Sequence, residues 1–227
     1  QLYYAERLYF LPLAIIGIAF GVVILPTLTR ALTENDSARA ESTIREGFEL
    51  AAFIAIPASV ALAVMPREIL SSLFQYGAFD TTATVQAGWI LFALSFGLVP
   101  VIIQRILYPT FFARKDTLTP MLLTFAGVLV QIIVAVILFP RVGVLGLGLS
   151  IAVAAWLQVL AAGAITLRRG FWRPDRALAL LMLRTLAAAA VMGGAVFLLK
   201  SFMIADFGTG NAWPKIPFMA LLVLGGG

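Results

Sequence analysis

The sequence predicts an all-α protein, a polytopic bundle of transmembrane helices, and three observations support this. Of its 227 residues, 62% are hydrophobic and only 12% are charged, whereas a soluble domain is about half apolar and about a quarter charged. The mean hydropathy is +1.02. The apolar residues form long runs that are apolar on all faces, without the alternation typical of a membrane β-barrel. Such a chain lacks the polar surface needed in water and is suited to hydrocarbon.

Six apolar runs are long enough to cross a bilayer, whose core of about 30 Å requires about 20 helical residues. A partial seventh run begins near Trp213. The chain starts with Gln1 and with residues typical of the interior of a span, so we expect a piece of a longer protein. The expected spans are 2–29, 47–65, 84–112, 120–139, 144–167, 177–200 and, in part, 213–227.

Two connecting segments are expected at the membrane surface. Arg30–Glu46 is polar, with acids and bases interleaved, and this favours a solvated loop and a short surface helix. Segment 66–82 is only half apolar. It predicts a short interfacial helix over 68–74 and a turn at Gly77.

Proline and glycine delimit the fourth and fifth spans. Thr119 followed by Pro120 is typical of a helix N-cap and a first helical position. Pro140 is expected to end that helix at Phe139, and Gly143 to form a tight turn before the next helix.

Interior prolines distinguish the first three spans, which contain Pro12, Pro57 and Pro100. Each removes a backbone hydrogen bond and kinks its helix. Such breaks are bending points in some transporters and static kinks in other membrane helices. Any gating motion is therefore predicted in these three spans.

Basic residues predict the orientation, because they accumulate in cytoplasmic connections. The first, third and fifth connections carry nine of them, and the second, fourth and sixth carry four. We therefore expect the odd-numbered connections in the cytoplasm and Gln1 near the outer face.

Glu6 and Arg7 are the charged residues of the first span, in YYAERLYFLPL. Ionisable groups at membrane depth usually face a bundle interior or a wet cavity. Since a guanidinium suits bidentate phosphate binding, Arg7 is a candidate for holding an anionic headgroup. Alternatively, it extends to the interface or pairs within its own protein. Helical spacing places it on one face with Leu11, Ala14, Gly17 and Gly21, a face on which the two glycines favour close helix packing.

Arg105, Arg184 and Gln131 are further candidates among the polar residues within the spans. Arg105 is nine residues before Arg114, about 13 Å along a helix. It either lines the inner part of a cavity or extends inward to the interface. Arg184 is expected to extend to the interface, and Gln131 to form a hydrogen bond between helices.

The composition argues against several classes of function. The sequence has neither cysteine nor histidine, which removes disulfides, thiolate nucleophiles and imidazole acid–base chemistry. Gly143, Gly146 and Gly148 have the wrong spacing for a dinucleotide site. We expect no enzyme activity, no cofactor and no metal. The net charge of +5 reflects membrane topology, so no nucleic-acid partner is expected.

Three motifs resemble a known family. YYAERLYFLPLAIIGIAFGVVILPTLTR is similar to a signature helix of the lipid II flippase family, MurJ (also called MviN), and SLFQYGAFD and ALSFGLVPVIIQRILYPTFFARKDTLTP follow in the same order. The run VGVLGLGLSIAVAAWLQ fits the following helix. The resemblance covers essentially the whole chain. It implies the C-terminal lobe, about spans eight to fourteen, of a fourteen-helix protein of the multidrug/oligosaccharidyl-lipid/polysaccharide exporter superfamily, with the N-terminal lobe absent from this chain.

The resemblance also implies a function. The family moves lipid II, the undecaprenyl-pyrophosphate-linked peptidoglycan monomer, to the outer leaflet of the bacterial inner membrane for cell-wall biogenesis. By resemblance, Arg7 matches the family's functionally needed arginine near the pyrophosphate, and Glu6 matches a position that is usually aspartate. Arg105 falls where relatives carry a basic residue. An acid that some members carry is replaced here by Phe10, and no acid lies in the fourth or fifth span, so a sodium site is not expected.

The implied mechanism is alternating access, with lipid II, membrane lipid and the N-terminal lobe as partners. A polar cavity would shield the headgroup, while the last two spans supply a hydrophobic groove for the lipid tail. Two other functions stay open. One is export of another polysaccharide lipid or a drug; the other is a non-transporting scaffold for cell-wall synthases, which would tolerate loss of Arg7.

Overall fold

The computed structural model describes residues 2–34, 36–74, 81–171 and 176–206. These residues are helical apart from short connections and include no strand, which confirms the prediction of an all-α membrane bundle. Within these described ranges, six helices are long and apolar enough to cross a membrane. The elements are α1 (Leu2–Ala19), the π-helix η1 (Phe20–Ile24), α2 (Leu25–Thr33), α3 (Ser37–Val64), α4 (Pro66–Phe74), α5 (Thr81–Phe112), α6 (Leu118–Val142), α7 (Val144–Arg168) and α8 (Arg176–Asp206).

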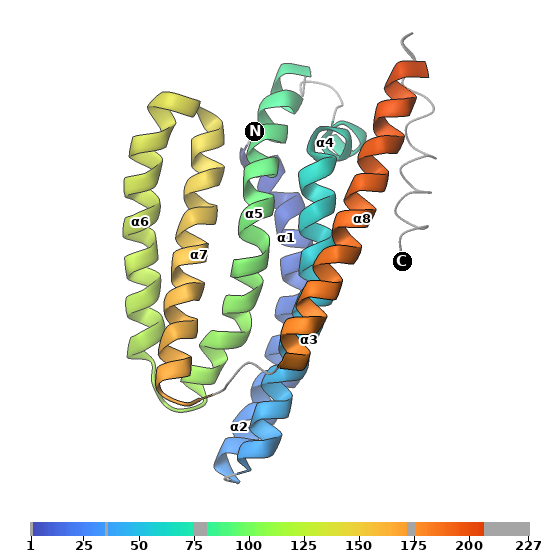
Figure 1. The fold of residues 1–227 in the computed structure, drawn as a ribbon. Coiled ribbons are helices and arrows are strands. Elements are labelled where there is room, and N and C mark those ends of the chain that lie inside the picture. The colour runs from blue at the N-terminus through green and yellow to red at the C-terminus, as the bar shows by residue number, and fades with distance from the viewer. Residues whose placement is uncertain (1, 35, 75–80, 172–175, 207–227) are drawn as a thin grey trace.

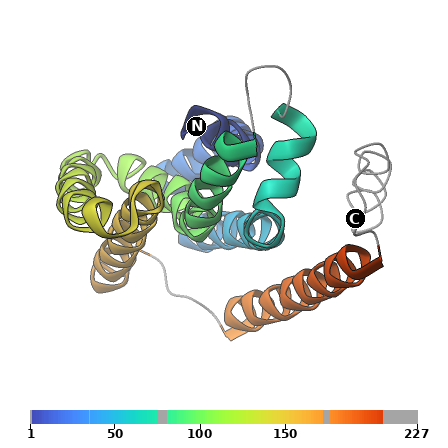
Figure 2. The same ribbon diagram turned by 90° about the horizontal axis from the view of Figure 1, so that it is seen from above.

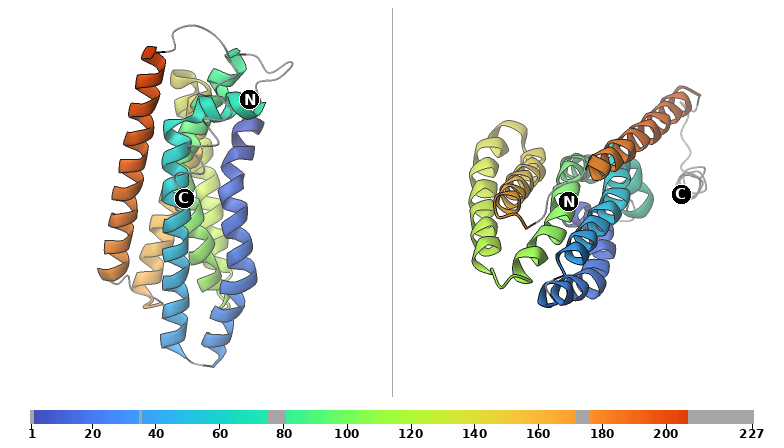
Figure 3. Two further views of the ribbon diagram at one scale, coloured as in Figure 1. Left: turned by 90° about the vertical axis from the view of Figure 1, so that its right-hand side faces the viewer. Right: turned by 60° about the horizontal axis from the view of Figure 1, so that its bottom comes forward.

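The long helices run up and down, and α5 is the central one (Figure 1). It packs against α1, α3, α4 and α7, while α6 packs on α7 to one side and α8 packs on α3 to the other. Viewed from above, α8 stands apart from the α6–α7 pair (Figure 2). The corner between α2 and α3 extends beyond the ends of the other helices (Figure 3).

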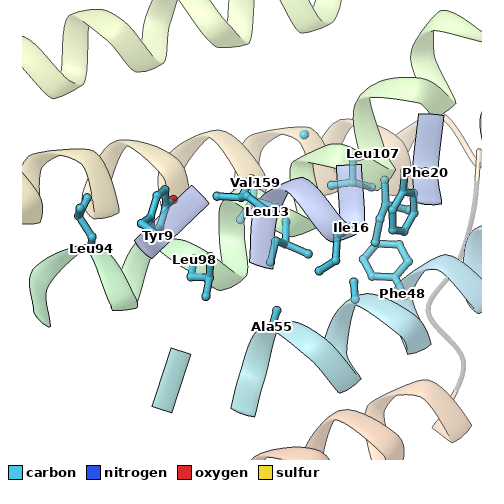
Figure 4. Packing of buried hydrophobic residues seen from close by; sticks show 14 of the residues in the cluster. Tyr9, Leu13, Ile16, Phe20, Phe48, Ala55, Leu94, Leu98, Leu107 and Val159 are labelled. Carbon is cyan, nitrogen blue, oxygen red and sulfur yellow. The ribbon is translucent and has the colours of Figure 1, made fainter. Parts of the chain in front are cut away.

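The core is a stripe along α5 that meets apolar side chains of its neighbours. Leu94, Leu98 and Ile102 recur at every fourth position of α5 and are at most 1% exposed, as expected for one face of a helix. Leu98 lies near Leu13 of α1 (Figure 4). The same cluster includes Ile16, Ala55 and Val159, from α1, α3 and α7.

Glycines bring α5 and α7 into close contact. A Cβ on Gly97 would lie 3.2 Å from Ala152 Cα, and one on Gly148 would lie 2.6 Å from Ala93 Cβ. Such contacts matter in lipid, where burying apolar surface contributes little free energy to helix association. Helices there associate through close packing and hydrogen bonds. The indole of Trp156 donates to Phe96 O at 3.0 Å. Side-chain bonds to the backbone thus add to the packing, and α5 and α7 form a rigid pair.

In the polar segment 30–46, the described residues are helical apart from Glu34 and Asp36 and belong to the ends of the long helices, so the expected loop with a separate short helix was wrong. α2 continues to Thr33 and α3 begins at Ser37. Asp36 is the N-cap of α3, and its carboxylate accepts a hydrogen bond from Arg39 N–H at 2.9 Å. The acids and bases of the segment pair one helical turn apart, as in Arg30–Glu34 and Arg45–Glu49, each at 2.9 Å. Every fourth residue of this part of α3 is also buried: Ala40, Ile44 and Phe48.

The helix of the fourth span begins two residues before and ends three residues after its expected limits. α6 begins at Leu118, and Asp116, not Thr119, supplies the capping side chain: its carboxylate accepts bonds from Thr119 N at 3.0 Å and Oγ1 at 2.7 Å. Pro140 lies within the last turn of α6 and does not end the helix at Phe139.

Two other expectations about the connections can be compared with the structure. Gly143 forms the expected turn with φ of 61°, a backbone conformation that favours glycine. The interfacial helix expected over 68–74 is α4. The turn at Gly77 and the partial span 213–227 lie outside the described residues.

The close packing of α7 on α5 gives a matched pair of substitutions. Gly148→Ala places a Cβ 2.6 Å from Ala93 Cβ and 3.0 Å from Ile90 O, and we expect it to lower the stability by about 1–3 kcal/mol. Gly163→Ala, in the same helix, meets no described atom within 4 Å. We expect it to be neutral or to stabilise by up to about 1 kcal/mol. Thermal unfolding in detergent, followed by circular dichroism, measures both, and equal stability of the two variants would contradict the contact.

Candidate functional site

Helix α1 has one buried face and one open face. Leu8, Leu13 and Ile16 are at most 5% exposed, and the helix packs mainly against α5. On the open face, Tyr3 is 58% exposed, and Arg7 is exposed as well. Below Arg7 this face is apolar, with Phe10, Leu11, Ile15, Ile18 and Val22 exposed.

Arg7 is oriented by an aromatic residue one turn earlier. Its Nη2 donates to the Tyr3 hydroxyl, and its Cζ lies 4.8 Å from the centre of the Tyr3 ring. A guanidinium has five N–H donors, so most remain available to a ligand. The ring contact adds cation–π attraction. Tyr3 therefore holds the planar group on the open face without enclosing it.

Glu6 and the glycines of the same helix are placed differently. Glu6 is partly buried, and in the described part of the chain no ion pair joins it to Arg7. A Cβ on Gly17 would have no described atom within 4 Å. The expected close helix packing at Gly17 is therefore not made within the described residues, and that side of α1 is open.

Arg105 lies on α5 and is exposed. It interacts electrostatically with Tyr9 of α1, whose hydroxyl donates to Gly97 O at 3.4 Å. Arg7 and Tyr9 are two positions apart, about 200° around the helix. The two arginines named from the sequence therefore meet different sides of α1, and the chain does not bring them into one pocket.

A π-helical turn, η1, interrupts the first span between Phe20 and Ile24. Pro26 follows it and has no N–H to donate to Val22 O, four residues earlier, so the regular helical ladder is broken here. The ring of Phe20 covers Gly47 of α3, where a Cβ would lie 2.9 Å from its Cε1. From the sequence we took Pro12 to kink this span, as either a bending point or a static kink, but we missed η1, for which Pro26 was the available signal.

Hydrogen bonds between the spans come from residues other than the one expected. Tyr108 donates to Gln158 Oε1 at 3.2 Å, and Gln104 donates to Ala155 O at 3.1 Å. Gln131 is partly buried, and among the described residues it forms no such bond. Arg184 is exposed on α8, consistent with extension toward the interface.

A polar cluster, absent from the sequence-based expectations, joins the α5–α6 connection to the end of α7. The Asp116 carboxylate accepts bonds from Thr119 and from Arg169, and Arg169 Nη2 also donates to Thr119 Oγ1 at 3.2 Å. Arg114 donates to Phe171 O at 3.1 Å and stacks 4.3 Å from its ring centre. The hydrogen bonds from Thr119 are the main cause that lowers the pKa of Asp116 from 3.8 to about 2, and the hydrogen bond from Arg169 has a smaller effect in the same direction. This cluster fixes one end of the α5–α6–α7 unit.

Comparison with known proteins finds one family. The family model described as "Lipid II flippase MurJ" matches residues 1–218. The probable lipid II flippase MurJ of Rhizobium meliloti (strain 1021) is 36% identical over 197 residues, covering 87% of this chain and 37% of that protein. The one from Rhizobium tropici is 34% identical over 224 residues, covering 98% of this chain and 42% of that protein.

A solved structure of a lipid II flippase MurJ in an inward closed conformation superposes with a TM-score of 0.78, covering 98% of this chain and 44% of that chain. At 22% identity, this likeness concerns the fold alone. The chain spans about two fifths of the length of these relatives.

The lowered pKa of Asp116 gives a pH-dependent prediction. Because the folded protein favours the carboxylate, its contribution to stability is complete above the ordinary pKa of 3.8 and is lost as the pH falls toward about 2. We expect Asp116→Asn to lower the melting temperature at about pH 6, and its difference from wild type to disappear on acidification through that range. Glu41→Gln, at an exposed acid of α3, is the control. A constant difference at every pH would contradict the role of the charge.

Proposed function

The chain belongs to the MurJ family of lipid II flippases, and from this premise we propose that residues 1–227 form the C-terminal lobe of a protein that moves lipid II across the bacterial inner membrane. The chain is a multi-pass membrane protein, and the family is one of transporters. The translocating unit would include an N-terminal lobe, because the relatives are more than twice as long as the region that they share with this chain. Moving a lipid between leaflets requires no covalent step, which supports a function other than catalysis.

The open face of α1 carries the proposal. A guanidinium in hydrocarbon is costly unless water or an anion meets it. Arg7 lies on the open face and is held there by Tyr3. We propose that the N-terminal lobe covers this face and leaves a wet cavity between the lobes. Arg7 would then bind the pyrophosphate of the lipid-linked sugar through paired N–H donors.

Glu6 and Arg105 would have secondary roles along the same route. The partly buried Glu6, as an ionised carboxylate, accepts hydrogen bonds only, so it would contact sugar hydroxyls beside Arg7. Arg105 is nearer the predicted cytoplasmic end and interacts with Tyr9. It would meet the anion at a different stage of transport, since it lies on another side of α1.

Alternating access needs one part that bends and one that does not. The contacts of Gly97 and Gly148, together with the Asp116 cluster, support α5–α6–α7 as the rigid part. The first span contains both Pro12 and η1 and is the part we expect to bend. Bending there would reorient Arg7 relative to α5 and so change which side of the membrane the cavity faces.

Substitution of Arg7 in the full-length protein tests the headgroup role. Hydrogen bonds to charged groups contribute about 1.5–3 kcal/mol, so we expect Arg7→Ala to slow lipid II flipping in vesicles by about tenfold or more. Arg7→Lys keeps the charge but not the bidentate geometry, and we expect partial activity. Arg30→Ala, at an exposed ion pair with Glu34, should retain activity. Normal flipping and complementation by a well-expressed Arg7→Ala protein would remove the headgroup role and favour the scaffold.

Competition in the same vesicles tests the substrate. We expect lipid II to be flipped in preference to other polyprenyl-pyrophosphate sugars, because the headgroup, not the shared tail, contacts the cavity residues. Equal transport of unrelated lipid-linked sugars would instead identify a broader exporter.

A further inference from the structure

A second open surface, distinct from the α1 face, lies where α8 crosses the bundle. It is a cleft of about 420 Å³ between α8 and the neighbouring helices. Helix α8 packs on α3 but stands apart from the α6–α7 pair (Figures 1 and 2). The walls come from α3, α5, α7 and α8, and include Ile56, Phe96, Val99, Trp156, Met182 and Leu186.

The polar atoms in these walls are already bonded within the protein. The Trp156 indole N–H donates to Phe96 O at 3.0 Å, and the Ser59 hydroxyl donates to Ser95 O at 2.6 Å. The apolar wall side chains are nevertheless accessible: Phe96 is 50% exposed and Trp156 is 42% exposed. A ligand therefore finds apolar contact and little hydrogen bonding, which suits an aliphatic chain.

The cation Arg176 lies on α8 about one helical turn before the residues of that helix that line the cleft. Ala179, Leu183 and Leu186 line the cleft, and Arg176 precedes Ala179 by three residues, about 4.5 Å along the axis. Arg176 is exposed, and in the described ranges it has no ion-pair partner. It lies at the end of α8 that adjoins a predicted cytoplasmic connection. A single lipid molecule could thus place its anionic headgroup at Arg176 and its acyl chain in the cleft.

We propose that this cleft binds one acyl chain of an anionic phospholipid from the cytoplasmic leaflet, whose phosphate contacts Arg176. The volume falls within the range of about 300–1,000 Å³ found for ligand pockets. It suits a single fatty acyl chain and is too small to enclose the whole undecaprenyl tail of lipid II. The bound lipid fills the space between α8 and the α5–α7 pair, where packing with protein is missing, and so fixes the position of α8.

Native mass spectrometry of the full-length protein tests this site, with phosphatidylglycerol and phosphatidylcholine of identical acyl chains as probes. We expect wild type to retain one phosphatidylglycerol in preference to phosphatidylcholine. Arg176→Ala should weaken that preference about tenfold, the size expected for loss of one charge-assisted contact. Ala179→Phe, which fills the cleft, should abolish retention of both lipids.

Two substitutions on other sides of α8 serve as matched controls. Arg184 is exposed on the same helix, and Ala188 is exposed nine residues after Ala179, about 180° around the axis. Arg184→Ala and Ala188→Phe should bind phosphatidylglycerol as wild type does. If Ala179→Phe does not fold, the comparison of Arg176→Ala with Arg184→Ala decides.

Fluorescence gives a second readout within the cleft. In a protein that keeps Trp156 and has phenylalanine at its other tryptophans, brominated phosphatidylglycerol should quench Trp156 at a low mole fraction and with saturation. Quenching that rises only in proportion to the bulk lipid would overturn the proposal. So would equal retention of the two phospholipids by wild type, or retention of the polyprenyl substrate alone.

Discussion

The close approach of α5 and α7 organises the rest of the molecule. In lipid, apolar surfaces gain little by leaving the solvent, so helices associate where their backbones come near enough for dispersion contacts and hydrogen bonds. Gly97 and Gly148 allow this approach from opposite helices. Trp156 then reaches Phe96 O across the contact. Because α5 also packs on α1, α3 and α4, the position of almost every other helix is set relative to this pair.

Helices α1 and α8 are packed on fewer sides than α5 and α7, and each therefore keeps an open surface. α1 packs along one face and keeps the other open, and η1 divides its span near the middle. α8 is fixed mainly by α3. The molecule thus combines a rigid unit, closed at one end by Asp116 and Arg169, with two outer elements whose free surfaces are available to lipid, substrate or another part of the protein.

Much of this architecture could be predicted from the sequence, because the cost of exposing polar groups to hydrocarbon is strong and local. Hydropathy was enough to predict an all-α bundle. The prediction failed at Arg30–Glu46, where we took the interleaved charges to indicate a solvated loop and a short surface helix. There, ion pairs one turn apart and a buried stripe through Ile44 extend the helices into water. The start of α6 was missed for a related reason: Asp116, on the connection, supplies the cap that we assigned to Thr119.

The candidate site was less predictable, because helical spacing relates residues within one helix and says little about distances between helices. The spacing correctly grouped Arg7 with the exposed Leu11, but it could not tell whether Arg105 faced the same space. The electrostatic interaction of Arg105 with Tyr9 depends on how α1 packs on α5, where the Tyr9 hydroxyl donates to Gly97 O. Likewise, Pro26 disturbs a helix in any context, but the position of η1 depends on how Phe20 fits over Gly47.

The open face of α1 and the cleft at α8 each combine one arginine with apolar side chains, and we propose that they meet different molecules: the face of α1 the transported lipid-linked diphosphate, and the cleft a membrane phospholipid. A lipid-linked diphosphate needs a cation and water for its headgroup, while its tail is most stable in hydrocarbon. Here the cation of α1 is held by Tyr3 on one side, and the cleft at α8, walled by apolar side chains, lies beyond α3 and α5. In our proposal, Arg7 faces a partner lobe while α8 stays in contact with lipid, so bending of the first span need not disturb the membrane contacts of α8.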